Sequence, residues 1–476
     1  MGDILKNSEN RLLDFFKRET GFCSPRIYSR RVSASETLVK KIDLYGKLIG
    51  HQGCVNTVEF NSTGELLVSG SDDRQVMLWE WATRKLRFSY PSEHLDNIFQ
   101  ARIMPYTDDR KIVTSSADFQ VRLSLLHDSG SVKTKRLSKH QGRVHKLAVE
   151  PGSPHVFYSC GEDGIVQHYD LRSDSATKLF SCSSRVENNR PPTTIGLNSI
   201  AINPRNPNYL SAGGADVYVR VYDIRKHETN TSQAKLGIPM DVFCPRHLIG
   251  THEAHITALA YSGAGELLVS YNDELIYLFE NGPSVGPGVL TSLTGNLQGP
   301  SYSQVYSGHR NSQTVKGVSF FGPNDEYVMS GSDCGNIFVW KKKGGELVRM
   351  MVGDRHIVNQ LEPHPMIPVF ATCGLEKSVK IWSPSSDDVR ALPENAHEIM
   401  ESNRQGREEH SRVILTPDVI MHVLRLHRRQ ARVYIERRDN REGMESDEDE
   451  GDAYVLGFSD GDPSDEGGAS NECNIS

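Results

Sequence analysis

A unit of about 40 to 60 residues recurs along this chain. Each copy contains an apolar run, a serine or threonine, a tight turn with an aspartate, an alternating strand and an aromatic residue. The unit is clearest in residues 66–79, 328–340 and 370–382. Stacked repeats of this length bury their apolar faces against one another, which favours a repeat architecture over an enzyme built around a single core.

The aromatic position of the unit can be followed through seven copies, which end near residue 384. It is occupied by Trp79, Ser124, Tyr169, Tyr222, Phe279, Trp340 and Trp382. Six residues before it stand Asp73, Asp118, Asp163, Asp216, Asp273, Cys334 and Glu376. Because a short polar side chain in a turn accepts hydrogen bonds from nearby backbone amides, we expect these aspartates to be structural.

Several copies also open with a histidine, namely His51, His140, His255, His309 and His356. Together these positions resemble the WD-repeat β-propellers, in which histidine, serine or threonine, aspartate and the aromatic residue form a hydrogen-bonded set inside a four-stranded blade. The resemblance implies an all-β, seven-bladed propeller at residues 40–390 and leaves the histidines without a catalytic role. Ser124, Ala212 and Cys334 depart from the pattern and are expected to weaken single blades.

The last copy lacks an outer strand of its own. Trp382 is followed by Pro384, which has no amide hydrogen to donate to a sheet. Residues 41–49, just before the first copy, alternate well enough to supply that strand from the other end of the propeller. We therefore expect the ring to be closed by its first strand, which removes an exposed sheet edge.

The composition favours a non-secreted protein without a bound metal or cofactor. No run of about 18 apolar residues is present, and the N-terminus lacks an apolar signal core. The eight cysteines show no Cys-x-x-Cys spacing, which fits reduced thiols in the nucleus and cytoplasm. The net charge is −7, but residues 442–476 contain twelve acidic residues and no lysine or arginine, so residues 1–441 carry +5.

The segments on either side of the propeller have different characters. Residues 1–39 form an N-terminal helical arm, which Gly21 and Pro25 interrupt. Its apolar side comprises Leu5, Leu12, Phe15 and Phe16. This side either packs on the propeller or binds in a groove of a partner.

Residues 391–441 are predicted to form a basic helical extension, and residues 442–476 a disordered acidic tail. The extension carries Arg425, Arg428, Arg429 and Arg432, which form either a solvated face or a site for nucleic acid or an importin. In the tail, the possible phosphorylation sites are Ser446, Ser459 and Ser464, and the possible prenylation site is Cys473. One lipid beside acidic residues gives weak anchoring, so we expect no stable membrane association.

Two neighbouring copies end with an aromatic-Asp-x-Arg sequence that the core does not require. These endings are Tyr169, Asp170 and Arg172 in one copy and Tyr222, Asp223 and Arg225 in the next. Their arginines suit an acidic or carbonyl-rich partner surface, or they pair with an acid of their own blade. The endings resemble the DWD box of cullin-4 substrate receptors, and the whole chain looks most like the type-eight family of DDB- and cullin-associated factors.

This resemblance implies a non-catalytic substrate receptor of a cullin-4 RING ubiquitin ligase. In that family the arginines face an adaptor, damage-specific DNA-binding protein one, and an N-terminal helix often inserts into the same adaptor. A different interpretation is a general scaffold or histone-tail reader without a ligase. We expect neither a small-molecule substrate nor nucleic-acid binding, and the blade pattern already accounts for the Ser, His and Asp residues that an enzyme would need.

Overall fold

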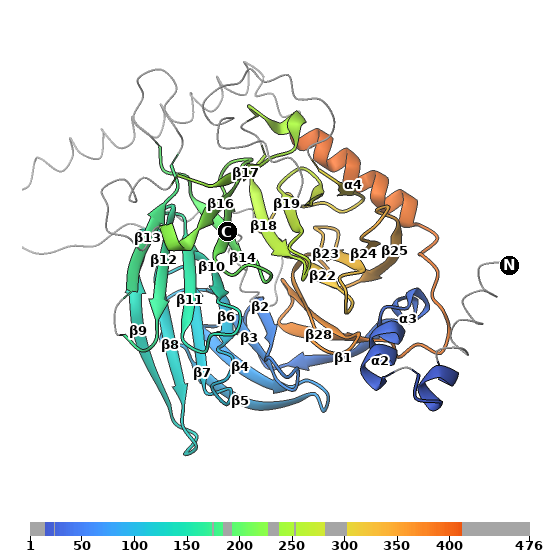
Figure 1. The fold of residues 1–476 in the computed structure, drawn as a ribbon, viewed down its shortest axis with the longest axis horizontal. Coiled ribbons are helices and arrows are strands. Elements are labelled where there is room, and N and C mark those ends of the chain that lie inside the picture. Colours follow the sequence, from blue (N-terminus) through green and yellow to red (C-terminus); the bar gives the residue numbers. More distant parts are fainter. Residues whose placement is uncertain are drawn as a thin grey trace, which may run out of the picture. The chain divides into compact units, whose positions relative to one another are not determined.

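The computed structural model describes residues 15–22, 24–173, 176–183, 193–226, 238–251, 254–280 and 302–411. Within these residues the chain forms a closed ring of seven antiparallel sheets, each with four strands (Figure 1). Each sheet is one blade, with its first strand nearest the centre of the ring. The predicted all-β, seven-bladed propeller is therefore confirmed.

The blades follow one another along the chain. Blade 1 contains β2 (Val55–Phe60), β3 (Leu67–Ser71), β4 (Gln75–Glu80) and β5 (Lys85–Pro91). Blade 2 contains β6 (Ile98–Ile103), β7 (Lys111–Ser116), β8 (Gln120–Leu126) and β9 (Val132–Lys139). Blade 3 contains β10 (Val144–Val149), β11 (Val156–Gly161), β12 (Ile165–Asp170) and β13 (Ala176–Ser181). Blade 4 contains β14 (Leu197–Ile202), β15 (Tyr209–Gly214), β16 (Val219–Asp223) and β17 (Asp241–Phe243).

The remaining blades use the same strand order. Blade 5 contains β18 (Ile256–Tyr261), β19 (Leu267–Tyr271), β20 (Ile276–Phe279) and β21 (Gln304–Tyr306). Blade 6 contains β22 (Val318–Phe321), β23 (Tyr327–Ser330), β24 (Asn336–Lys341) and β25 (Leu347–Val352). Blade 7 contains β26 (Val358–Pro363), β27 (Phe370–Gly374), β28 (Ser378–Ser383) and β1 (Asp43–Ile49). Short 3-10 helices span Ile224–Lys226 and Arg246–Leu248.

The first strand of the propeller closes the ring, as the sequence predicts. β1 pairs antiparallel with β28, with Leu48 opposite Val379, although more than 300 residues separate them. The side chain of Leu48 is 1% exposed and belongs to an apolar cluster between blades 7 and 1 that includes Trp79 and Ile381. Closure therefore joins the two ends of the propeller through both backbone hydrogen bonds and apolar packing.

The two faces of the ring are distinct. The histidine face is formed by the loops that lead into each first strand and by the turns between second and third strands. The arginine face is formed by the loops between first and second strands and by the ends of the third strands. Because all seven blades share one strand order, equivalent positions of different blades lie on the same face.

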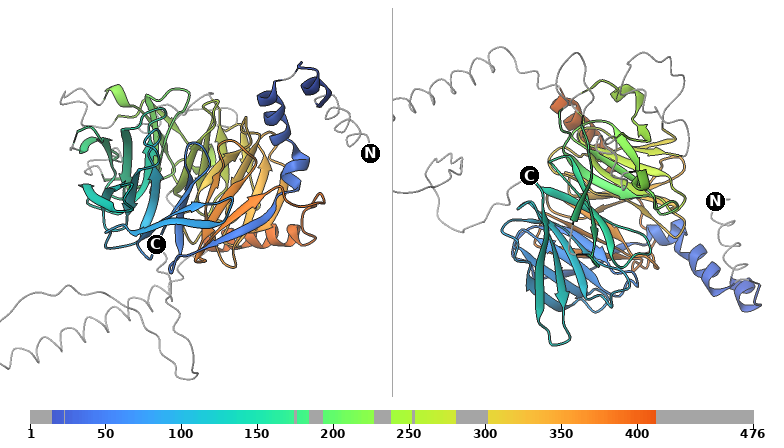
Figure 2. Two further views of the ribbon diagram at one scale, coloured as in Figure 1. Left: turned by 90° about the horizontal axis from the view of Figure 1, so that it is seen from below. Right: turned by 60° about the vertical axis from the view of Figure 1, so that its left-hand side comes forward.

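Helices lie against opposite faces of the ring (Figure 2). α2 (Pro25–Ser33) is anchored on the arginine face of blade 6, where Arg30 donates to the carbonyl of Pro323 at 2.9 Å. α3 (Glu36–Lys40) then leads into β1. α4 (Ala396–Ser411) lies on the histidine face, where Asn403 donates to the carbonyl of Gly308 at 2.8 Å.

Blades 1 and 3 contain complete hydrogen-bonded sets, and blade 2 contains the set without its aromatic residue, which Ser124 replaces. In blade 1, His51 Nδ1 lies 2.9 Å from Asp73 Oδ2, while Ser69 Oγ lies 2.7 Å from His51 Nε2 and accepts from Trp79 Nε1 at 2.8 Å. His140 bridges the equivalent residues of blade 3. The sequence analysis missed His94, which bridges blade 2 in the same way. His94 stands 24 residues before Asp118, and His51 stands 22 residues before Asp73 in blade 1. This similar spacing is the sequence signal that could have identified His94.

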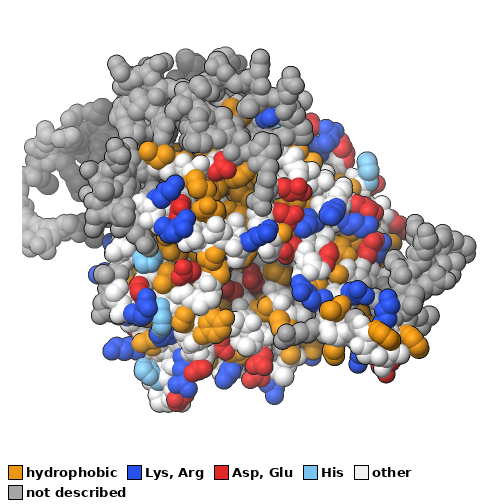
Figure 3. Space-filling model, viewed as in Figure 1, with side chains coloured by type: hydrophobic (Ala, Val, Ile, Leu, Met, Phe, Trp, Pro, Cys, Tyr) orange, Lys and Arg blue, Asp and Glu red, His pale blue; other side chains and the backbone are white. Residues whose placement is uncertain are grey.

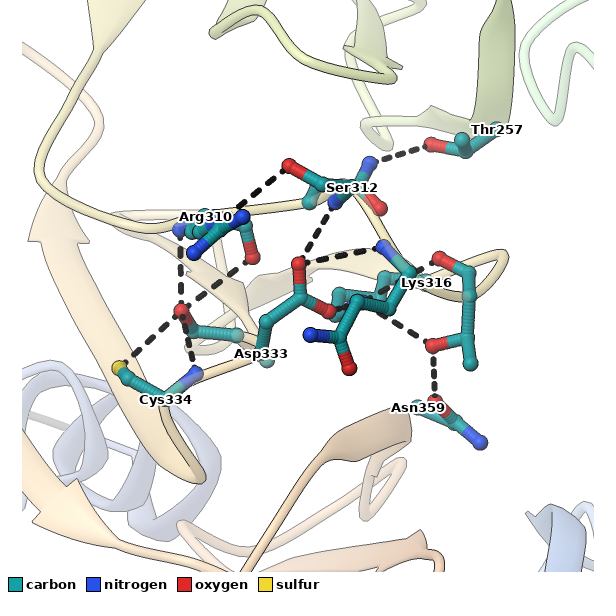
Figure 4. Close-up of polar contacts among 12 residues, drawn as sticks. Thr257, Arg310, Ser312, Lys316, Asp333, Cys334 and Asn359 are labelled. Carbon is teal, nitrogen blue, oxygen red and sulfur yellow. Dashed lines mark hydrogen bonds and ion pairs between the residues drawn. The ribbon is translucent and has the colours of Figure 1, made fainter. Parts of the chain in front are cut away.

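The later blades replace this set with other polar pairs. In blade 6 both ring nitrogens of the buried His309 lack a hydrogen-bond partner, because Cys334 occupies the position of the carboxylate. Desolvation lowers the pKa of His309 to about 3. Asp333 instead accepts from the Ser312 amide at 2.6 Å and forms an ion pair with the buried Lys316 (Figure 4). The expectation that the opening histidines share one structural role therefore fails in this blade.

Stability at low pH is expected to depend on these buried carboxylates. Burial by itself raises the pKa of Asp118, but hydrogen bonds from His94 and two backbone amides lower it to about 2. A depressed pKa stabilises the fold above the unfolded value of about 3.9 and is lost as pH falls towards the folded value. When the pH is lowered from about 5 to about 2.5, the unfolding free energy of the native chain should therefore fall more than that of Asp118→Asn. Urea denaturation at each pH measures both values. The exposed Asp128→Asn is the control and should behave like the native chain.

Candidate functional site

The arginines of the two aromatic-Asp-x-Arg endings lie on the arginine face, just after β12 and β16. Their side chains are 68% and 62% exposed. Each guanidinium is held by the aspartate two residues earlier: Arg172 Nη2 donates to Asp170 at 2.8 Å, and Arg225 Nη2 donates to Asp223 at 2.9 Å. The intrablade pair considered from the sequence is thus present in both blades, yet the arginines still face solvent.

These ion pairs orient the arginines. In each pair, Nε and Nη2 of the arginine bond the carboxylate, while the structure shows no bond from Nη1 to another described residue. The hydrogen bond from Arg172 lowers the pKa of Asp170 to about 2, and Arg225 lowers the pKa of Asp223 in the same manner. Each carboxylate is therefore charged at neutral pH and holds its guanidinium with an edge available to a partner.

The tyrosines of the same endings are internal. Tyr169 is 2% exposed and stacks on Phe157, with ring centroids 4.4 Å apart. Tyr222 is fully buried and stacks on Phe180 at 3.9 Å. Their side chains fix the strand ends that carry the arginines, so of the six predicted residues Arg172 and Arg225 offer the accessible polar groups.

The N-terminal arm reaches the same face as these arginines. Besides its bond to Pro323, Arg30 donates to the side-chain oxygen of Asn324 at 2.9 Å, in the loop between the first two strands of blade 6. Tyr327 donates to the carbonyl of Ala34 at 3.0 Å. These contacts join residues almost 300 positions apart in the chain. The arm and the two arginines thus belong to one face.

The described part of the arm exposes an apolar surface. Residues 15–19 are helical, and Gly21 follows with a positive φ of 75° that ends the turn. The exposed apolar residues are Phe15, Phe16, Phe22, Ile27 and Val32, which are 40 to 87% exposed. Apolar side chains gather over these helices at the lower right of the space-filling view (Figure 3). Five large apolar side chains in so short a segment are typical of a surface that a partner covers.

Further apolar residues on the arginine face were missed in the sequence. Tyr106 is 75% exposed in the loop of blade 2, and Met366 is 71% exposed in the loop of blade 7. The intervening loop of blade 1 is bonded to both neighbours, since His364 Nε2 lies 2.9 Å from the Gly64 carbonyl and Asn61 donates to Asp109 at 2.9 Å. Single apolar residues in loops carry no periodic signal, which is why the sequence did not reveal them.

Several predicted residues lie outside the described part of the chain. These are Leu5, Leu12, Arg425, Arg428, Arg429, Arg432, Ser446, Ser459, Ser464 and Cys473. Their roles stay predictions.

Within the described ranges, no helix is both long and apolar enough to cross a membrane. The same ranges contain no cluster of three or more histidine, cysteine or acidic side chains able to hold a metal ion. Five cysteines carry free thiols: Cys160, Cys182, Cys244, Cys334 and Cys373.

The fold and the blade pattern define a class of protein. A family model described as WD domain, G-beta repeat matches residues 43–80, 131–170 and 300–341. The crystal structure of the Cps50 (Swd1) β-propeller domain of Myceliophteria thermophila matches with a TM-score of 0.55 at 20% identity, over 72% of this chain and 99% of that one. The chain is a WD-repeat β-propeller protein.

Three curated relatives each match between 56 and 62% of this chain. DDB1- and CUL4-associated factor 6 of mouse is 34% identical over 275 residues, 56% of this chain and 31% of the relative. Protein ALTERED SEED GERMINATION 2 of Arabidopsis thaliana is 33% identical over 298 residues, 56% of this chain and 39% of the relative. Human WD and tetratricopeptide repeats protein 1 is 30% identical over 305 residues, 62% of this chain and 42% of the relative.

These relatives support a WD-repeat family of the type that includes DDB1- and CUL4-associated factors. The fold and the relatives indicate a non-catalytic scaffold or receptor, in agreement with the sequence analysis. The chain spans less than half the length of the curated relatives that it matches. The finer resemblance to the type-eight family stays a prediction.

Proposed function

We propose that this protein is a substrate receptor of a cullin-4 ubiquitin ligase and that its arginine face binds the adaptor, damage-specific DNA-binding protein one. The observation that carries the proposal is the placement of two oriented arginines and an exposed apolar arm on one face of the ring. The name of the relative DDB1- and CUL4-associated factor 6 suggests the partner.

The two parts of this face supply different kinds of contact. Arg172 and Arg225 offer charge-assisted hydrogen bonds to carboxylates or carbonyl groups of the adaptor. The arm offers aromatic anchors such as Phe16 and Phe22, which lose apolar surface to solvent only when a partner covers them. A partner that engages both parts at once gains affinity because the second contact is intramolecular.

The receptor acts through position and performs no covalent step itself. Binding on the arginine face leaves the histidine face available for a client protein. Ubiquitin transfer is then carried out by the ligase's conjugating enzyme, to which the client is held close. This role needs a rigid ring between the two faces, and the closed propeller provides it. We expect such a receptor to act in the nucleus and the cytoplasm.

The proposal is tested with the double variant Arg172→Asp, Arg225→Asp. We expect it to stay folded, with a lower melting temperature because Asp223, whose side chain is 5% exposed, loses its ion pair with Arg225. The amount of adaptor that co-precipitates from cells should fall at least about tenfold relative to the native chain. The matched control is Arg143→Asp, Arg355→Asp, which makes the same charge change at exposed positions of the histidine face. If the native chain recovers no adaptor, the scaffold or histone-tail reader becomes the better interpretation.

A further inference from the structure

A cavity of about 100 Å³ lies at the centre of the ring, at its histidine-face end. Residues at or beside the inner strands of all seven blades line it, together with Asp72 and Leu375 from the turns of blades 1 and 7. It is therefore a site that the closed ring creates and that no single blade contains. Its volume admits a small polar group, such as the end of a side chain, and excludes a folded domain.

One charged side chain in this cavity lacks a direct partner. The ammonium group of Lys146, on β10, forms no ion pair or hydrogen bond with any residue that the structure describes. The buried lysines and arginines of the ring each have a direct partner: Lys316 with Asp333, Lys380 with Asp354 and Glu376, Arg220 with Asp216, and Arg349 with the backbone carbonyls of Ile42 and Ala391. Lys146 is half-buried and lines the cavity without a direct counter-ion among the described residues, so an anion bound in the cavity would supply the partner that this ammonium group lacks.

Two carboxylates further along the channel only partly balance this charge. Glu59 lies 3.2 Å from Arg102 and is engaged by that guanidinium, and Glu362 interacts with Lys146 without a direct contact. Desolvation raises the pKa of Glu59 to about 8 and that of Glu362 to about 7. Burial thus favours the uncharged form of both carboxyl groups, and burial together with the charge of Arg102 also lowers the pKa of Lys146. An anion bound in the cavity would favour the charged form of Lys146.

Two side-chain amides of blade 7 line the same cavity and add hydrogen-bond donors. Asn359 Oδ1 accepts from Thr314 at 2.6 Å, so the NH₂ group of Asn359 is left for another acceptor. Gly317 makes room for the neighbouring amide, because a Cβ at this position would stand 2.4 Å from Gln360 Oε1. An ammonium group and two amides in the lining of one small cavity are suited to an anionic oxygen cluster.

Asp72, the acidic residue at the histidine-face entrance of the cavity, is engaged by other groups and does not serve as the counter-ion of Lys146. Asp72 accepts from Asn56 Nδ2 at 2.7 Å, and the same amide donates to the carbonyl of Ile98 at 3.0 Å. Burial, together with the nearby charges of Asp73 and Asp96, raises the pKa of Asp72. The cavity thus has a polar rim fixed by hydrogen bonds and a cation deeper inside.

We propose that this cavity binds the carboxylate or phosphate of an acidic peptide that enters from the histidine face, with Lys146 as its counter-ion. The amides of Asn359 and Gln360 complete the hydrogen bonds to the anion. The site lies on the face opposite Arg172 and Arg225, so it stands whether or not the arginine face binds the adaptor. In a ligase receptor it would select clients with an exposed acidic segment.

The test measures binding of fluorescent peptides to the full chain by anisotropy. One peptide carries glutamates, a second carries phosphoserines at the same positions, and a third carries lysines there. We expect the first or second to bind and the third not to bind. The better of the two acidic peptides identifies carboxylate or phosphate as the preferred group. Binding of the lysine peptide alone, or of none of the three, would overturn the proposal.

Two variants separate the site from a general effect of charge. Lys146→Gln removes the cation, and Gly317→Ala fills the space beside Gln360 without any change of charge. Both variants are expected to bind the acidic peptide about tenfold or more weakly than the native chain does. Co-precipitation of the adaptor should stay unchanged. Lys377→Gln is the control, because Lys377 is exposed in a turn of the same face outside the cavity. Equal binding by the native chain and by both folded variants would refute the site.

Discussion

Replacing Leu48 by aspartate is expected to prevent the ring from closing. Leu48 is 1% exposed, lies opposite Val379 of β28 and packs in the cluster that contains Trp79. A carboxylate there would be buried without a partner, at a cost of several kcal/mol. We therefore expect Leu48→Asp to lose at least about 3 kcal/mol of unfolding free energy, or to be recovered as an aggregate.

The neighbouring residue provides the matched control. Ile49 follows Leu48 in the same strand, but its side chain points to the other side and is 77% exposed. Ile49→Asp should therefore keep the native unfolding free energy in urea denaturation. Equal stability of the two variants would show that β1 contributes little to the fold, contrary to the pairing of β1 with β28.

The closing strand was predictable because both of its signals are local. Alternation in residues 41–49 and the missing donor of Pro384 each depend on a few neighbouring residues. The internal sets of blades 1 and 3 were predictable for the same reason, since the repeat fixes their spacing. The altered pairing in blade 6 was not predictable. There Lys316 takes the histidine's place as the partner of an aspartate, and the repeat pattern specifies no residue at position 316.

The candidate site was only partly readable from the sequence. The strand order places Arg172 and Arg225 on one face, as two adjacent blades imply, and the aspartate partner of each lies only two residues away. The docking of the arm by Arg30 on the loop of blade 6 depends on a contact across 293 residues. Lys146 is an ordinary strand residue in the sequence, and its position at the centre of the ring emerges only when all seven blades close.

The arm is expected to be a main source of adaptor affinity. Phe16 and Phe22 are 64% and 87% exposed, so Phe16→Asp, Phe22→Asp should leave the melting temperature unchanged. Aromatic anchors commonly dominate interface energies, because their burial removes large apolar areas from water. We therefore expect this double variant to lower adaptor binding at least about tenfold, measured by co-precipitation and by titration with purified adaptor.

A matched control separates anchoring from nonspecific stickiness. Leu95 and Val352 are each 76% exposed on the histidine face, so Leu95→Asp, Val352→Asp makes the same charge change at two exposed apolar residues. That variant should bind the adaptor normally. If both double variants lose the adaptor equally, exposed apolar residues on either face contribute to binding, and the arm is not a specific adaptor contact. If the arm variant binds like the native chain while the arginine variant does not, the adaptor contacts the strand ends alone, and the arm is left to a different partner.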